Sequence, residues 1–208
     1  MRRAAFAVAA VFMLVVSPWM RGQTRIASDI EIREMEEEAR KAKGFDAKVS
    51  AHYNLGELRH ERNESEAAQR HYQTTLQLAR DERNAARRDH SIPRYALACS
   101  WSGVALAGLG RDSEAFAVLE EAVRYAADSP GVWNLYSSAM FRLGVPQKAI
   151  GAARMSVAAA ERKMPVQAPV RQLLELNVHR YALAQALLNV RGGAEDQEGA
   201  TIPRQVTP

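Results

Sequence analysis

A helix–turn–helix pattern occurs twice between residues 95 and 157, and the second copy repeats the first at a fixed offset. Gly110 precedes Ala115 by five positions, and Gly144 precedes Ala149 by the same distance. The offset from Gly110 to Gly144 is thirty-four positions, and a fixed period of this length is typical of stacked supersecondary units that bury their apolar faces against their neighbours. The pattern therefore predicts an all-α fold of consecutive antiparallel helix pairs. Further positions that keep the offset are Cys99 and Trp133, Leu106 and Met140, Leu119 and Ala153, Ala122 and Ser156, and Val123 and Val157.

An earlier and more divergent copy lies forty-seven positions upstream of the second, which is thirteen more than the period. We expect the extra residues to lengthen the helix that starts near Glu64 and continues through Arg88, together with the helix that opens near Pro93, because proline is accepted in a first helical turn. The earlier copy is marked by His52, Leu55, Gly56, Ala68, Tyr72 and Thr75.

Two kinds of position recur in the three copies for a physical reason. Small residues recur where two helices must approach closely: Gly56, Gly103, Ser137, Ala68, Ala115 and Ala149. Gly110 and Gly144 stand where a helix ends and the chain reverses, a position that favours the left-handed conformation. Asn63 occupies the equivalent place in the first copy, and asparagine is the next best residue for that conformation.

Tetratricopeptide repeats have the same period and carry a Trp, Leu-Gly, Tyr, Ala, Phe, Pro skeleton. The sequence resembles this family over roughly residues 47–160, with Leu55-Gly56 in the first copy and Trp133, Met140 and Ala149 in the third. The resemblance implies an α-solenoid of about three repeats with terminal capping helices, within residues 28–190. The alternative is an ordinary helical bundle whose spacing is coincidental.

The same resemblance implies a concave groove lined by the first helix of each pair, which would hold an extended peptide or a helix. Lysine is missing from these positions, so we do not expect the carboxylate clamp found in some members of the family. For Tyr53 and Trp101 the alternative is that the ring packs between neighbouring helices. The groove candidates are Tyr53, Asn54 and Glu57 in the first copy, Ser100, Trp101 and Val104 in the second, and Asn134, Ser138, Phe141 and Arg142 in the third.

The N-terminal residues 1–22 are predicted to be a signal peptide. Arg2 and Arg3 precede a thirteen-residue apolar run, and the pair Ser17-Pro18 follows it. If the segment is not cleaved, residues 4–20 would attach the protein to a membrane. At the other end, residues 191–208 contain glycine, proline and acidic residues, and we expect a disordered tail.

The segments that flank the repeats carry helix signals. Ser28 and Glu31 form a capping box at the start of a helix that extends to Lys43. Asp46 is the expected N-cap of the next helix. A last helix is expected over residues 169–190, after a linker that starts at Lys163, and its expected apolar face includes Ala184.

The sequence lacks the patterns of the common catalytic and metal sites. It contains no HExxH, CxxC, GxxxxGK[ST], GxGxxG or GxSxG motif, so we expect neither an enzyme nor a cofactor nor a bound metal. Cys99 is expected to be a core residue, and His52 a packed imidazole. Outside residues 1–22 there are 25 basic and 24 acidic residues, which removes the main argument for nucleic-acid binding.

The sequence thus predicts an exported, non-catalytic scaffold that binds another protein or peptide through its groove. It would act in the bacterial periplasm, or at the outer face of the inner membrane if the leader is retained. The alternative is a structural subunit of an envelope assembly that self-associates through its ends or through the long helix over residues 64–88.

Overall fold

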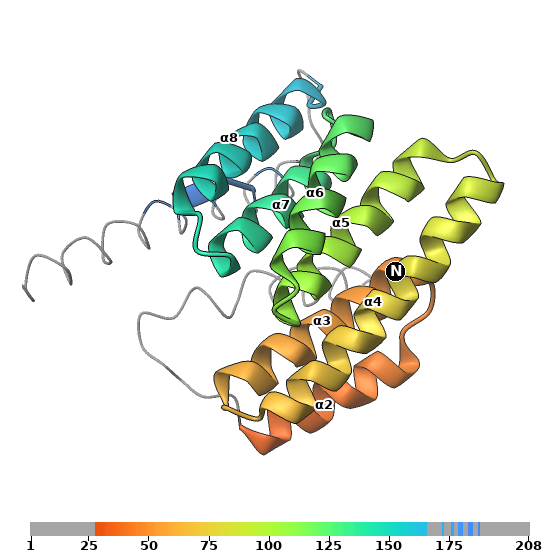
Figure 1. The fold of residues 1–208 in the computed structure, drawn as a ribbon, viewed down its shortest axis with the longest axis vertical. Coiled ribbons are helices and arrows are strands. Elements are labelled where there is room, and N and C mark those ends of the chain that lie inside the picture. Colours follow the sequence, from red (N-terminus) through yellow and green to blue (C-terminus); the bar gives the residue numbers. More distant parts are fainter. Residues whose placement is uncertain are drawn as a thin grey trace, which may run out of the picture.

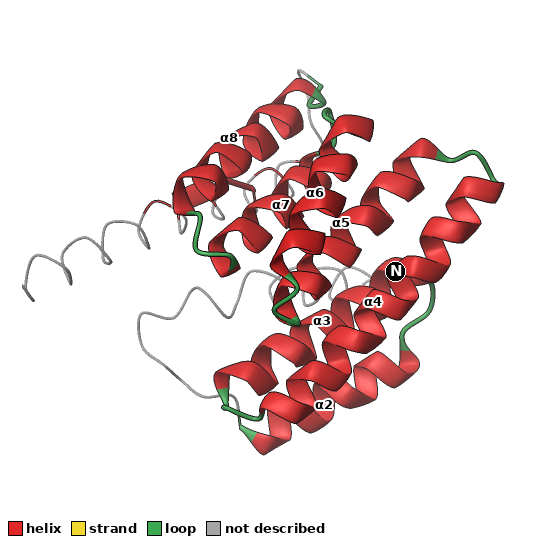
Figure 2. Ribbon diagram, viewed as in Figure 1, coloured by secondary structure: helices red, strands yellow, loops and turns green. Residues whose placement is uncertain are grey.

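The computed structural model describes residues 28–165 together with Gln172, Leu176, His179, Arg180, Leu183, Ala184 and Leu187. This part of the chain is all helical and contains no strand (Figures 1 and 2), which confirms the predicted all-α class. The predicted leader over residues 1–22 and the predicted tail over residues 191–208 lie outside the described residues. The helices are α2 (Asp29–Lys41), α3 (Phe45–Glu61), α4 (Ser65–Arg88), α5 (Ile92–Gly108), α6 (Asp112–Tyr125), α7 (Pro130–Arg142) and α8 (Pro146–Arg162).

Helices that follow one another in the chain pack side by side. The most extensive contacts join α3 to α4, α4 to α5, α5 to α6 and α7 to α8, and the contact between α6 and α7 is much smaller. In addition, α5 packs against α7, and α2 covers part of α3. Figure 1 shows α3, α4 and α2 at one end of the described chain and α7 and α8 at the other, with α5 and α6 between them.

The predicted lengthening of the second helix is confirmed. Helix α4 has 24 residues and ends at Arg88, and α5 begins at Ile92 with Pro93 in its first turn. In Figure 1 the turn between α4 and α5 lies at the right edge of the molecule, beyond the other helix ends on that side. The thirteen additional residues therefore lengthen the helical hairpin formed by α4 and α5.

Four helices end in the same kind of turn. The residue after the C-cap has a positive φ: 61° at Asn63, 51° at His90, 71° at Gly110 and 69° at Gly144. The next residue donates its backbone N–H to a carbonyl five positions back, as in the 2.9 Å bonds from Arg111 to Leu106 and from Val145 to Met140. This is the Schellman arrangement of helix C-termini. The left-handed conformations predicted for Asn63, Gly110 and Gly144 are confirmed.

The helix starts agree with the sequence at Ser28 and differ at Asp46. Ser28 and Glu31 form the predicted capping box at the start of α2. The prediction that Asp46 caps α3 was wrong, because α3 already begins at Phe45 with Gly44 at the N-cap. Gly44 has a φ of 83°, which only glycine adopts without strain, and the helix starts two residues earlier than a cap at Asp46 would place it.

The small residues lie where the helices are in closest contact. A Cβ atom placed on Gly56 would stand 2.6 Å from the ring of Tyr72, and one on Gly103 would stand 2.6 Å from Cδ2 of Leu119. Ser137, in the third copy, donates its hydroxyl to the carbonyl of Ala149 at 2.8 Å. The first helix of each pair therefore meets the second at a residue with little or no side chain.

Most of the positions that are one repeat period apart are buried to a similar extent. Leu106 and Met140 are buried, as are Ala115 and Ala149, and Leu119 and Ala153. Cys99 is buried as predicted, while Trp133 at the equivalent position is only partly buried and donates its indole N–H to the carbonyl of Ala127. Towards the C-terminus, Leu183 packs against Ile150 and Ala153. Ala184 is exposed, so its predicted place on the apolar face was wrong.

Candidate binding sites

The ten predicted groove residues lie on α3, α5 and α7 as expected, and most of them are covered. Those on α3 and α5 are buried, with at most 9% of the residue surface exposed. The four on α7 are partly buried. Tyr53 lies between two other rings, with centroid distances of 6.0 Å to Tyr72 and 5.8 Å to Trp101. Tyr53 and Trp101 therefore pack between helices, which was the alternative that the sequence left open.

A polar cluster at the centre of this region joins α3, α4 and α7. Arg142 forms an ion pair with Glu57, 85 positions away in the chain. Tyr72 donates its hydroxyl to Glu57 Oε1 at 2.7 Å and accepts a hydrogen bond from Arg142 Nη2 at 2.9 Å. Burial raises the pKa of the Tyr72 hydroxyl, and the negative charge of Glu57 raises it further. The cluster thus holds an ionised pair and a neutral phenol.

Sequence reasoning placed Glu57 and Arg142 on one face but missed their contact with each other. It also missed Tyr72, because this residue lies on α4, the second helix of its pair. The signal for Tyr72 was its position opposite Gly56, where only a residue without a side chain leaves room for the ring. Through the cluster, Glu57 and Arg142 pair their charges within the protein, while the buried Nε of Arg142 has no hydrogen-bond partner among the described residues.

Two histidines form a second polar contact between α3 and α4. The Nδ1 atoms of His52 and His71 are 3.2 Å apart. Burial lowers the pKa of both imidazoles, and for His71 the pKa is about 4. One ring must donate and the other accept in this contact, so the accepting Nδ1 carries no proton. His52 is thus partly buried against a partner, and no group of three or more metal-ligating side chains exists within the described residues.

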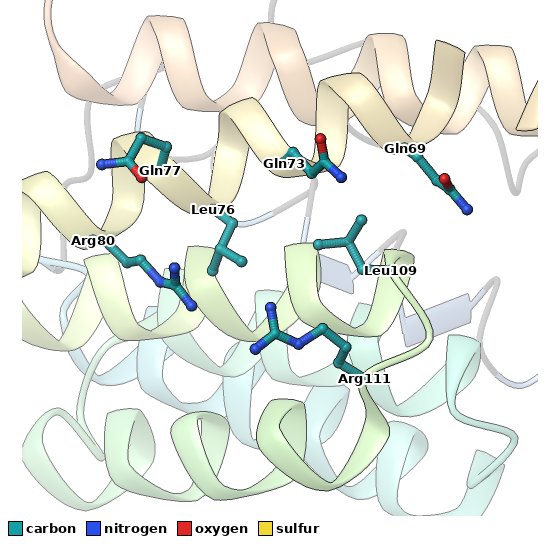
Figure 3. Close-up of a pocket in the computed structure, with 7 residues that line it drawn as sticks. All are labelled: Gln69, Gln73, Leu76, Gln77, Arg80, Leu109 and Arg111. Carbon is teal, nitrogen blue, oxygen red and sulfur yellow. The ribbon is translucent and has the colours of Figure 1, made fainter. Parts of the chain in front are cut away.

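A pocket of about 420 Å³ opens on a different face of α4 (Figure 3). Its volume is in the range of small ligand sites. One wall is α4, and the other is the turn from α5 to α6. Apolar surface is limited to Leu76 and Leu109, and the remaining lining is polar. The lining residues are Gln69, Gln73, Leu76, Gln77, Arg80, Leu109 and Arg111.

The polar lining of this pocket is open to solvent and only partly engaged. Gln77 donates to Asp81 Oδ1 at 2.9 Å, and Arg111 binds both carboxylate oxygens of Glu114 at 2.7 Å. The bond from Arg111 lowers the pKa of the Glu114 carboxyl, and the charge of Arg80 lowers it further. This pocket was not predicted from the sequence, although glutamines at i, i+4 and i+8 must share one helix face.

The start of α5, at the tip of the long hairpin, and the end of α6 each carry an exposed apolar side chain. Ile92 and Tyr125 are more than half exposed, and both line a second pocket of about 330 Å³ next to Tyr95. Tyr95 accepts from Arg87 at 2.7 Å and donates to Glu121 at 2.7 Å. Two of the basic residues near the end of α4, Arg83 and Arg87, therefore donate hydrogen bonds to Tyr95 within the protein.

Comparison with protein-family models, with curated proteins and with solved structures finds no match to this chain. Among the described helices, none combines the length and the apolar character needed to cross a membrane.

Proposed function

We propose that this protein is a non-catalytic scaffold of tetratricopeptide-like helix pairs that binds another protein. The observation that carries the proposal is the equivalence of positions one repeat period apart. Gly110 and Gly144 adopt the same left-handed turn, and the apolar partners Leu106 and Met140 are both buried. Such arrays serve as binding surfaces because each pair repeats a rigid unit along an extended face.

The rigidity of the face formed by α3, α5 and α7 supports this role. The ion pair between Glu57 and Arg142 connects the first and third of these helices. A preformed face loses little conformational entropy on binding. The partly buried residues of α7, which include Asn134 and Ser138, are the ones available to a partner without unpacking the core.

We also propose that the protein is exported and acts in the periplasm, or on the periplasmic side of the inner membrane when residues 4–20 stay attached. This proposal rests on the charged start and the apolar run of residues 1–22.

Affinity capture of the tagged full-length protein from crosslinked cells tests the scaffold role. We expect a small, reproducible set of envelope proteins, and we expect the N-terminus of the recovered protein to begin near Gln23. Asn134→Ala should weaken capture several-fold while the circular dichroism spectrum stays unchanged. Asn84→Ala, at an exposed position of α4, is the matched control and should capture normally.

A second candidate function is self-association, which the exposed Ile92 and Tyr125 favour because such pairs of large apolar residues mark interaction surfaces. Recovery of crosslinked dimers of this chain alone would support it and would contradict the scaffold role.

A further inference from the structure

We propose that the pocket between α4 and the α5–α6 turn binds an extended peptide segment that carries an acidic side chain. The glutamines of α4 would pair with the peptide backbone, and Arg80 would bind the carboxylate. The inference rests on the proposed protein-binding role, and it assigns that role a second surface, on a different face of α4 from the polar cluster.

The spacing of the glutamines fits an extended backbone. Gln69, Gln73 and Gln77 follow one another at four-residue intervals along α4 (Figure 3). Four residues of a helix rise by about 6 Å. An extended strand repeats its backbone groups every two residues, at about 6.6–6.8 Å. Successive glutamines can therefore meet successive equivalent peptide groups over a short segment.

The chemistry of the glutamines fits the same ligand. Each side-chain amide offers both a donor and an acceptor, as a peptide group does. Gln69 and Gln73 make no hydrogen bond within the part of the chain that the structure describes, and both are exposed. Gln69 and Gln73 line the pocket. The side of a bound peptide that faces them would replace its hydrogen bonds to water by hydrogen bonds to their side-chain amides, while its other side would stay in water.

The charge of the pocket selects an acidic segment. No hydrogen bond or ion pair holds Arg80 among the described residues, although its charge acts on Glu114, whereas Arg111 is bound directly by Glu114. The pocket thus offers one available guanidinium at the end of the glutamine row. A guanidinium binds a carboxylate through two parallel hydrogen bonds.

The dimensions and the sparse apolar lining argue against other occupants. From Gln69 to Arg80 the helix rises by about 16 Å, which is the length of about five extended residues. Leu76 and Leu109 supply too little apolar surface for the apolar face of a partner helix. One available arginine and a nearly balanced charge outside residues 1–22 do not suit a nucleic-acid backbone.

Binding of a defined peptide to the full-length protein tests the inference. The probe is the acetylated and amidated pentapeptide Thr-Glu-Thr-Glu-Thr, since threonine favours an extended chain. In a nuclear magnetic resonance titration of the ¹⁵N-labelled protein, we expect saturable shifts of the Gln69 and Gln73 side-chain amides. Arg80→Gln should weaken binding about tenfold and Gln73→Ala about fivefold, the changes expected for a charged and a neutral hydrogen bond.

Matched controls lie on α8, where Arg154→Gln and Gln147→Ala alter exposed residues of the same types and should leave binding unchanged. Equal binding of Thr-Lys-Thr-Lys-Thr, absence of saturable shifts, or equal weakening by Arg154→Gln would each overturn the inference. If the peptide fails to bind while the full-length protein still captures an envelope partner, only the pocket assignment fails. If capture fails as well, the proposed function falls with it.

Discussion

His52 and His71 illustrate how one contact between single residues makes stability depend on pH. Their Nδ1 atoms lie 3.2 Å apart, so the contact needs a neutral acceptor ring. The pKa of His71 is lowered to about 4, mainly by burial and further by the charges of His52, Arg59 and Arg70, which the charge of Glu36 opposes. Two protonated rings at this distance would also repel each other.

The sign of the effect follows from proton uptake. In the unfolded chain His71 takes up a proton as the pH falls through about 6.5, whereas in the folded protein it does so only near pH 4. The stabilisation is therefore complete above pH 6.5 and is lost progressively between pH 6.5 and about 4. Urea unfolding at pH 7.0, 5.5 and 4.5 measures this loss of stability. We expect His71→Gln to reduce this pH dependence and the exposed His60→Gln to retain it; an unchanged slope in His71→Gln would contradict the assignment.

At the scale of helices and turns, the sequence predicts well what depends on local backbone preference. The helix ends at Asn63, Gly110 and Gly144 follow from residue type, because glycine and asparagine tolerate a positive φ. The fourth such turn, at His90, has no comparable signal, since histidine adopts this conformation only occasionally. The unusual length of α4 could be predicted because the first two copies are thirteen positions further apart than the repeat period.

The candidate sites depend on the relative positions of helices, which the period leaves open. The predicted groove residues were assigned to the correct helices, yet the repeat does not determine how tightly α3, α5 and α7 close on one another. The contact between Glu57 and Arg142 follows from that closure. The glutamine row on α4 is visible in the sequence, but the opposite wall of its pocket, Leu109 and Arg111, comes from a different helix pair.

The close approach of α5 and α6 at Gly103 gives a prediction at this scale. Gly103→Ala would place a Cβ atom 2.6 Å from Cδ2 of Leu119, which is buried. The overpacking cost of about 1–3 kcal/mol should exceed the gain of about 1 kcal/mol that alanine brings to a helix interior. We expect a net loss of up to about 2 kcal/mol in the free energy of unfolding, measured by urea denaturation.

Gly151→Ala is the matched control for Gly103, because it lies in α8 with no atom within 4 Å of the added Cβ. This variant should be stabilised by about 0.5–1 kcal/mol. If Gly103→Ala is stabilised to the same extent, the two helices are not in the contact described.

For the molecule as a whole, the pair Glu57–Arg142 is the contact that joins the most distant parts of the described chain. Only 5% of the Glu57 side chain and 13% of the Arg142 side chain are exposed. Arg142→Met would leave the Glu57 carboxylate buried without its cation. We expect a loss of about 3–5 kcal/mol in the free energy of unfolding, measured by urea denaturation.

The double variant Glu57→Met and Arg142→Met tests whether this loss comes from the unpaired charge. Replacement of a buried ion pair by apolar side chains is often neutral, so most of the loss should be recovered. An equal or greater loss in the double variant would show instead that Tyr72 and its neighbours need the pair for their packing. The exposed pair Arg111–Glu114 serves as a comparison, and its disruption should have little effect.

The link between α3 and α7 also has a mechanical consequence. In a linear array each helix pair touches only its neighbours, so a stretching force applied at the two ends can peel away one pair after another. Here the ion pair between Glu57 and Arg142 closes a loop of the chain that contains α4, α5 and α6. Tension between these two residues is carried by their short contact and bypasses the enclosed helices. The enclosed hairpins should therefore stay folded until the contact opens, and then extend together in one step.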